Sequence, residues 1–156
     1  MLVNRAFVSR NVEGLRPRIE ALANGLIDGF AADGGTELLK SFAAPVPAVV
    51  IAEMLGLPAE MANQLLAWSN RMVAMYMFGV TEAVEHDANA AAVEFVAYLR
   101  TVIAERRRAP QADLLTHMLT AEVDGEKLSE GEVISTAILL LAVAATILIR
   151  FRQKPN

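Results

Sequence analysis

The chain has 156 residues, of which 54% are hydrophobic, and its formal net charge is −4. This length suits one domain, and the apolar share exceeds the roughly 45–50% of ordinary soluble domains. The sequence contains no cysteine, which excludes disulfides, thiolate nucleophiles and cysteine-ligated zinc, iron–sulfur or haem sites supplied by the chain itself. The acidic balance argues against nucleic acid as a partner.

The N-terminal part of the chain predicts two helices separated by a short strand. Pro17 suits a first helical turn, and apolar residues recur at helical spacing from Ile19 to Phe30. Gly34 and Gly35 end this helix. Residues 36–42 predict a brief strand, after which a helix runs from Pro45 toward Gly56.

The middle of the chain predicts two amphipathic helices. After Pro58, one face carries Ala62, Leu65, Leu66, Ser69, Met72, Val73 and Tyr76, and Gly79 ends the segment. Thr81 is a plausible N-cap for a long helix that ends near Arg108. Its predicted buried stripe comprises Val84, Ala88, Ala91, Phe95, Leu99 and Val102. The basic run 106–108 is interpreted as a solvated helix end.

The C-terminal part begins with Asp113, which can cap a short helix over residues 114–119, and continues through a polar turn at 122–127. Ser129 and Glu132 form a capping box, so the last helix is predicted over residues 129–150. Residues 133–149 are apolar on every face and must be surrounded by protein or by lipid. No internal repeat or long linker is visible, so residues 1–156 form one unit.

Few residues carry recognisable chemistry. His86 and His117 lie in different predicted helices, and the acidic neighbours of His86 indicate a solvated helix face, so no metal site is predicted. Met72, Met75 and Tyr76 are interpreted as ordinary core or as the lining of an apolar ligand pocket. Taken alone, the hydroxyl of Thr146 is expected to bond back to a carbonyl of its own helix.

Several segments, in order, resemble one family. They are Phe7, LRPRI at 15–19, VIAEMLGLP at 50–58, Trp68, and the run from DLLTHML at 113–119 through LSEGEV at 128–133. In this order they resemble the bacterial-type cytochrome P-450 monooxygenases, the haem-thiolate enzymes, over residues 2–142. The ordered combination is far more specific than any single motif.

The resemblance implies a partial, all-α cytochrome P-450-like fold with minimal strand, running from the end of the family's third helix to its long central helix. The domain 1–156 would be incomplete, lacking the N-terminal part and the cysteine haem loop. Where the family commonly has A-G-x-[DE]-T, this chain has residues 142–146, AVAAT. The resemblance assigns Ala142 to cofactor binding and Thr146 to catalysis. It makes Met72, Met75 and Tyr76 substrate-pocket residues, and it is lost in the basic tail 147–156.

The function implied is that of a truncated haem-dependent monooxygenase, whose family inserts one oxygen atom of dioxygen into an apolar organic substrate. The family also implies a ferredoxin or flavin-type electron donor and a cytoplasmic location. Without a cysteine the chain should not bind haem stably through a thiolate and should be inactive alone. Self-association through exposed apolar faces is expected.

Two alternatives from other classes remain open. The first is a single-pass membrane protein with its span at 133–149, followed by the basic flank Arg150, Arg152 and Lys154. The second is a helical interaction module without chemistry. The capping box favours a buried central helix over a membrane span.

Overall fold

Helices make up most of the computed structural model, which describes residues 9–31, 35–123 and 125–152, with side chains in 13–31, 35–122 and 125–142. The elements in chain order are α2 (Ser9–Ala31), the π-helical turn η1 (Leu39–Ala43), α3 (Pro45–Met54), the 3-10 turn η2 (Ala59–Met61), α4 (Ala62–Val73), the 3-10 turn η3 (Ala74–Tyr76), α5 (Glu82–Arg108), α6 (Leu114–Thr120), β1 (Glu122–Val123), β2 (Glu126–Lys127) and α7 (Glu130–Arg152). Strands β1 and β2 form a short antiparallel pair. The predicted all-α class is confirmed.

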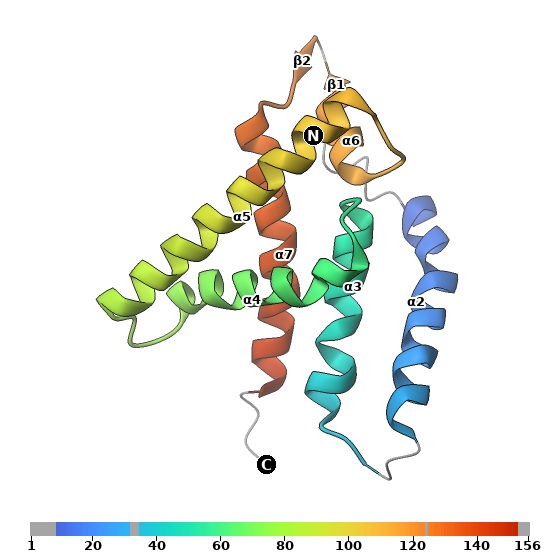
Figure 1. The fold of residues 1–156 in the computed structure, drawn as a ribbon, viewed down its shortest axis with the longest axis vertical. Coiled ribbons are helices and arrows are strands. Elements are labelled where there is room, and N and C mark those ends of the chain that lie inside the picture. The colour runs from blue at the N-terminus through green and yellow to red at the C-terminus, as the bar shows by residue number, and fades with distance from the viewer. Residues whose placement is uncertain (1–8, 32–34, 124, 153–156) are drawn as a thin grey trace.

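Helix α4 lies at the centre of the arrangement. Figure 1 shows α2 and α3 side by side, α4 crossing α7, and α5 leading from the outer end of α4 to α6 and the hairpin. The helix α4 packs against α3, α5 and α7. The core therefore gathers where these helices meet, and its largest fully buried side chains include Leu55, Leu65, Phe95, Leu99, Ile103, Leu115 and Leu141.

Side-chain caps start the two long helices where the sequence predicts. Thr81 Oγ1 accepts from the backbone N–H of Val84 (3.4 Å) at the start of α5. At the start of α7, the Ser129 N–H donates to the Glu132 carboxylate (2.8 Å), and the Glu132 N–H donates to Ser129 Oγ (3.3 Å). Hydrogen bonds from Ser129 hold the pKa of Glu132 below its usual value. The stripe predicted for α5 is confirmed, since five of its six residues are buried and Val84 is half-buried.

Three local predictions are wrong. Pro17 lies inside α2, which begins at Ser9, and not in its first turn. Residues 36–42 do not form a strand, because the backbone from Leu39 winds into η1 and stays helical through Ala44 into α3. Tyr76 does not share the buried face of α4, and it is 86% exposed. The helix α4 ends at Val73 and the chain continues as the 3-10 turn η3, which breaks the helical spacing that would have buried Tyr76.

Arg106 corrects the interpretation of the basic run as a solvated helix end. Its side chain is 8% exposed and its Nε donates to Asp113 Oδ2 (2.5 Å), while the Asp113 side chain is 5% exposed. A second guanidinium nitrogen donates to the carbonyl oxygen of Gly56 (2.5 Å). Asp113 Oδ1 also caps α6 by accepting from Thr116 N (2.7 Å). Arg107 and Arg108 are exposed, as predicted for them.

The apolar start of α7 is covered by protein. Val133, Ile134, Ala137 and Leu141 are all buried in the core cluster. Within the described residues, no helix has the length and apolar character needed to cross a bilayer. The proposed span at 133–149 includes residues 143–149, whose side chains lie outside the described residues.

We predict that Gly56→Ala lowers the free energy of unfolding by roughly 2–4 kcal/mol. Gly56 has φ +75°, and an added Cβ would overlap the Asp113 carboxylate. The matched control is Gly125→Ala, because Gly125 has φ +84° with open space around it. The control should cost about 1 kcal/mol, the penalty of a left-handed backbone alone. Urea unfolding followed by circular dichroism measures both, and equal losses would show that the Asp113 contact is unimportant.

Candidate functional site

A cavity lies where the end of α4, the turn η3, the start of α5 and the middle of α7 meet. Its volume is about 860 Å³. The lining residues are Met72, Val73, Met75, Tyr76, Glu82, Glu85, His86, Ala88, Asn89, Ala92, Ser135, Ile138, Leu139 and Ala142. A mainly apolar concave site of this size, with a few polar groups, is typical of small-molecule binding.

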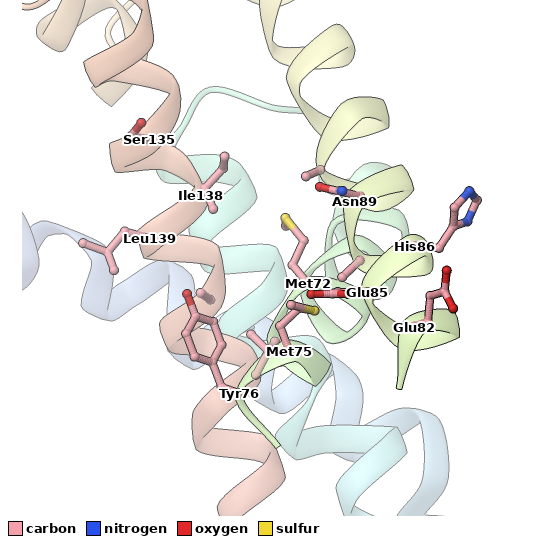
Figure 2. A pocket seen from close by; sticks show the side chains of 14 residues that line it. Met72, Met75, Tyr76, Glu82, Glu85, His86, Asn89, Ser135, Ile138 and Leu139 are labelled. Carbon is pink, nitrogen blue, oxygen red and sulfur yellow. The ribbon is translucent and has the colours of Figure 1, made fainter. Parts of the chain in front are cut away.

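The structure places four of the five sequence-predicted site residues around this cavity. Met72, Met75 and Tyr76 come from α4 and η3, and Ala142 comes from α7. Tyr76 is largely exposed and lies in front of α7, whereas Met72 and Met75 lie between α5 and α7 (Figure 2). Thr146 is in α7 four residues beyond Ala142, and its side chain lies outside the described residues. The roles of these residues in binding and catalysis stay predictions.

Polar residues on α5 were missed as members of the site. Glu85 and Asn89 point from α5 toward α7, whereas Glu82 and His86 point to the other side of α5 (Figure 2). The sequence interpretation placed Glu85 on a solvated acidic face, and the structure leaves Glu82, Glu85 and Asp87 exposed. The signal that could have separated these residues is spacing, because positions four apart share one helix face and Glu85 and Asn89 flank the buried Ala88.

A buried hydrogen bond fixes α4 against α7 beside the cavity. Ser69 is fully buried, and its Oγ donates to the carbonyl oxygen of Leu141 (2.9 Å). Leu141 precedes Ala142, and Ser69 lies one turn before Met72. This bond therefore sets the spacing of two cavity walls.

Ion pairs and a tryptophan fix α4 against α5. Trp68 Nε1 donates to Glu94 Oε2 (2.7 Å), and Arg71 pairs with Asp87 (2.8 Å) and with Glu94 (3.2 Å). The hydrogen bond from Trp68, followed by Arg71, holds the pKa of Glu94 below its usual value. Trp68 also contacts the ring of Phe95, with centroids 5.6 Å apart. The three cavity walls are thus linked by contacts outside the cavity itself.

The chain does not supply a metal centre at this cavity from its described residues. They contain no group of three or more His, Cys, Asp or Glu placed to hold a metal ion. The full sequence contains no cysteine, so its donor atoms do not fit a thiolate-ligated haem. The arrangement can enclose and orient an apolar molecule.

We predict that Ser69→Ala lowers the free energy of unfolding by about 1–2 kcal/mol, because the buried Leu141 carbonyl loses a donor. The matched control is Ser135→Ala, which changes an exposed serine on α7 and should stay within about 0.5 kcal/mol of the parent. Thermal unfolding by calorimetry compares them. A Ser69→Ala chain as stable as the control would show that this bond does not hold α4 to α7.

The relatives and solved structures that match this chain include cytochrome P450s. No family model matches the chain. The sequence is 40% identical over 141 residues to Cytochrome P450 107B1 of Saccharopolyspora erythraea, covering 90% of this chain and 33% of that protein. It is 38% identical over 140 residues to the polyketide biosynthesis cytochrome P450 PksS of Bacillus subtilis, with the same coverage.

Comparison with solved structures also finds cytochrome P450s. The crystal structure of P450BioI in complex with an acyl carrier protein matches with a TM-score of 0.86 and 31% identity, over 92% of this chain and 37% of that chain. The chain thus spans about a third of the length of the relatives it matches. Over that third, the chain is similar in sequence and in fold to bacterial cytochrome P450s.

Proposed function

We propose that this chain forms part of the substrate pocket of a haem-dependent monooxygenase that inserts one oxygen atom of dioxygen into an apolar organic substrate. The observation that carries the proposal is the cavity of about 860 Å³ bounded by α4, η3, α5 and α7. Its lining combines flexible, polarizable methionines with the small residue Ala142, and this combination suits irregular apolar molecules.

The work of this chain in that pocket is to exclude water and to orient the substrate. Met72, Met75 and Ile138 supply the apolar surface between α5 and α7. Ala142 leaves space beside α7, in keeping with the role in cofactor binding that the family resemblance assigns to it. Thr146 is proposed as the hydroxyl on the oxygen side, by the same resemblance.

In this family haem supplies the oxygen-activating chemistry, and a cysteine thiolate binds the haem iron. This chain has no residue of that kind. The sequence contains no cysteine, so we propose that the 156-residue chain is inactive alone and holds no thiolate-ligated haem. An electron donor of the ferredoxin or flavin type and a cytoplasmic location, both expected from the family, stay predictions.

We predict that the chain, mixed with haemin, reduced and exposed to carbon monoxide, will not show the red-shifted Soret band of a thiolate-ligated haem. Absorption spectroscopy measures this directly. A relative such as Cytochrome P450 107B1, treated identically, is the positive control. The red-shifted band in this chain would overturn the proposal that it cannot hold the cofactor.

A chimera tests the positive half of the proposal. The segment of Cytochrome P450 107B1 that matches this chain, up to the position of Ala142, is replaced by the corresponding residues of this chain. The chimera should show the red-shifted Soret band with carbon monoxide and oxygenate an apolar substrate, because the remaining part of the relative supplies the haem ligand. A chimera that is folded and binds haem but oxygenates none of the relative's substrates would count against a pocket role for this segment.

A second candidate function, a helical interaction module, is favoured by the exposed apolar side chains. Val93 and Leu139 are more than half exposed and Phe78 is fully exposed. We predict concentration-dependent self-association, measurable by analytical ultracentrifugation, and Phe78→Ser together with Leu139→Ser should weaken it. Sedimentation as a monomer across the accessible concentration range would contradict this prediction.

A further inference from the structure

The cavity has one wall that differs in chemistry from the others. The walls from α4 and α7 are dominated by apolar residues, whereas α5 contributes Glu85 and Asn89, which both point toward α7 (Figure 2). Neither side chain has a hydrogen-bond or ion-pair partner in the described part of the chain. A carboxylate and an amide oxygen are thus presented together to whatever occupies the cavity.

No positive charge on the described lining balances Glu85. The lining includes no lysine or arginine, and His86 points to the other side of α5. The nearby Arg71 is already paired with Asp87 and Glu94. A cationic ligand would therefore meet an unneutralised carboxylate.

The helix dipole gives a simpler reason for acidic residues in the first turn of α5, and it accounts for their presence. The dipole does not explain why the Glu85 side chain points toward α7, because a carboxylate on any face of the first turn is stabilised by the dipole to the same extent. Asp87, two residues after Glu85, does not line the cavity and pairs with Arg71, so a cation partner was available to another carboxylate of the same helix.

We propose that the cavity selects amphiphilic ligands that carry a protonated amine, with the ammonium group bound by Glu85 and Asn89 and the apolar body between α4 and α7. This inference rests on the proposed function, because it takes the cavity to be the ligand site. The carboxylate accepts a charge-assisted hydrogen bond from the ammonium, and the Asn89 amide oxygen accepts a second.

Three probes of equal chain length and different head group test the inference: decylamine, decan-1-ol and decanoate. Isothermal titration calorimetry on the full 156-residue chain at pH 7 and low salt should give decylamine an affinity about tenfold or more above decanoate, with decan-1-ol between them. The preference should shrink as salt is added, because screening weakens an interaction at a partly exposed carboxylate.

Glu85→Gln should bring the decylamine preference to within about threefold of decanoate. Glu60→Gln makes the same change in net charge at an exposed residue outside the cavity, and it should keep the preference. Ala92→Phe, which fills part of the cavity, should weaken binding of all three probes. Circular dichroism checks that each variant folds, and Glu85→Asp offers a second test, because it should retain part of the preference.

The outcomes separate this inference from the proposed function. If decan-1-ol binds and Ala92→Phe abolishes its binding, but decylamine and decanoate bind equally, the cavity is a ligand site without an ammonium subsite and the inference is wrong. A preference for decylamine that Glu85→Gln leaves unchanged also contradicts it. If none of the probes binds, both the inference and the proposed pocket fail.

Discussion

The ion pair between Arg106 and Asp113 is the constraint on which the placement of the helices depends. Both side chains are almost completely buried, and desolvating two charges costs several kcal/mol for each ion unless the geometry of the pair is good. Here the cost is offset by further hydrogen bonds, because the guanidinium also donates to Gly56 O and the carboxylate also accepts from Thr116 N. The end of α5, the start of α6 and the turn at Gly56, which lies 50 residues before Arg106, therefore meet at one point.

This meeting point controls the cavity at a distance. Arg106 lies in the last turn of α5, and Glu85 lies in its first. With a rise of 1.5 Å per residue the two positions are about 30 Å apart along one continuous helix. Fixing Arg106 fixes the rotation of α5 about its axis, and this rotation decides which residues of its first turn face α7. The core stripe ending in Phe95, Leu99 and Val102 enforces the same rotation through packing.

The sequence predicted the elements whose signals are local. The capping box of Ser129 and Glu132 and the cap at Thr81 were correctly placed, because their partners lie three residues away. It could not show that Arg106 is buried, since its acceptors lie 7 and 50 residues away and come together only through the fold. Residues 36–42 were predicted as a strand from local pattern alone, and the described structure places no strand beside them.

The candidate site was predictable in part for the same reason. Met72, Met75 and Tyr76 lie within five residues of one another, so any pocket at the end of α4 would involve them together, and the family resemblance supplied Ala142. The contribution of α5 to the cavity could not be predicted, because Glu85 lies in the same turn as Glu82 and two residues before Asp87. Three acidic residues so close together indicate a single solvated helix face. In the structure all three are exposed, but Glu85 points toward α7, Glu82 points to the other side of α5, and Asp87 pairs with Arg71.

The cavity therefore depends on two kinds of interaction that act at different ranges. Short-range contacts such as Ser69 with Leu141 set the distance between α4 and α7. The long-range constraint at Arg106 sets the rotation of α5, and a turn of one residue, about 100°, would remove Glu85 from the wall. Such a rotation would also turn the buried Phe95 and Leu99 out of the core, so the packing of α5 opposes it together with the Arg106 site. The rotation that the core requires is therefore the one that turns Glu85 toward α7, and it affects ligand choice only if Glu85 contacts the ligand.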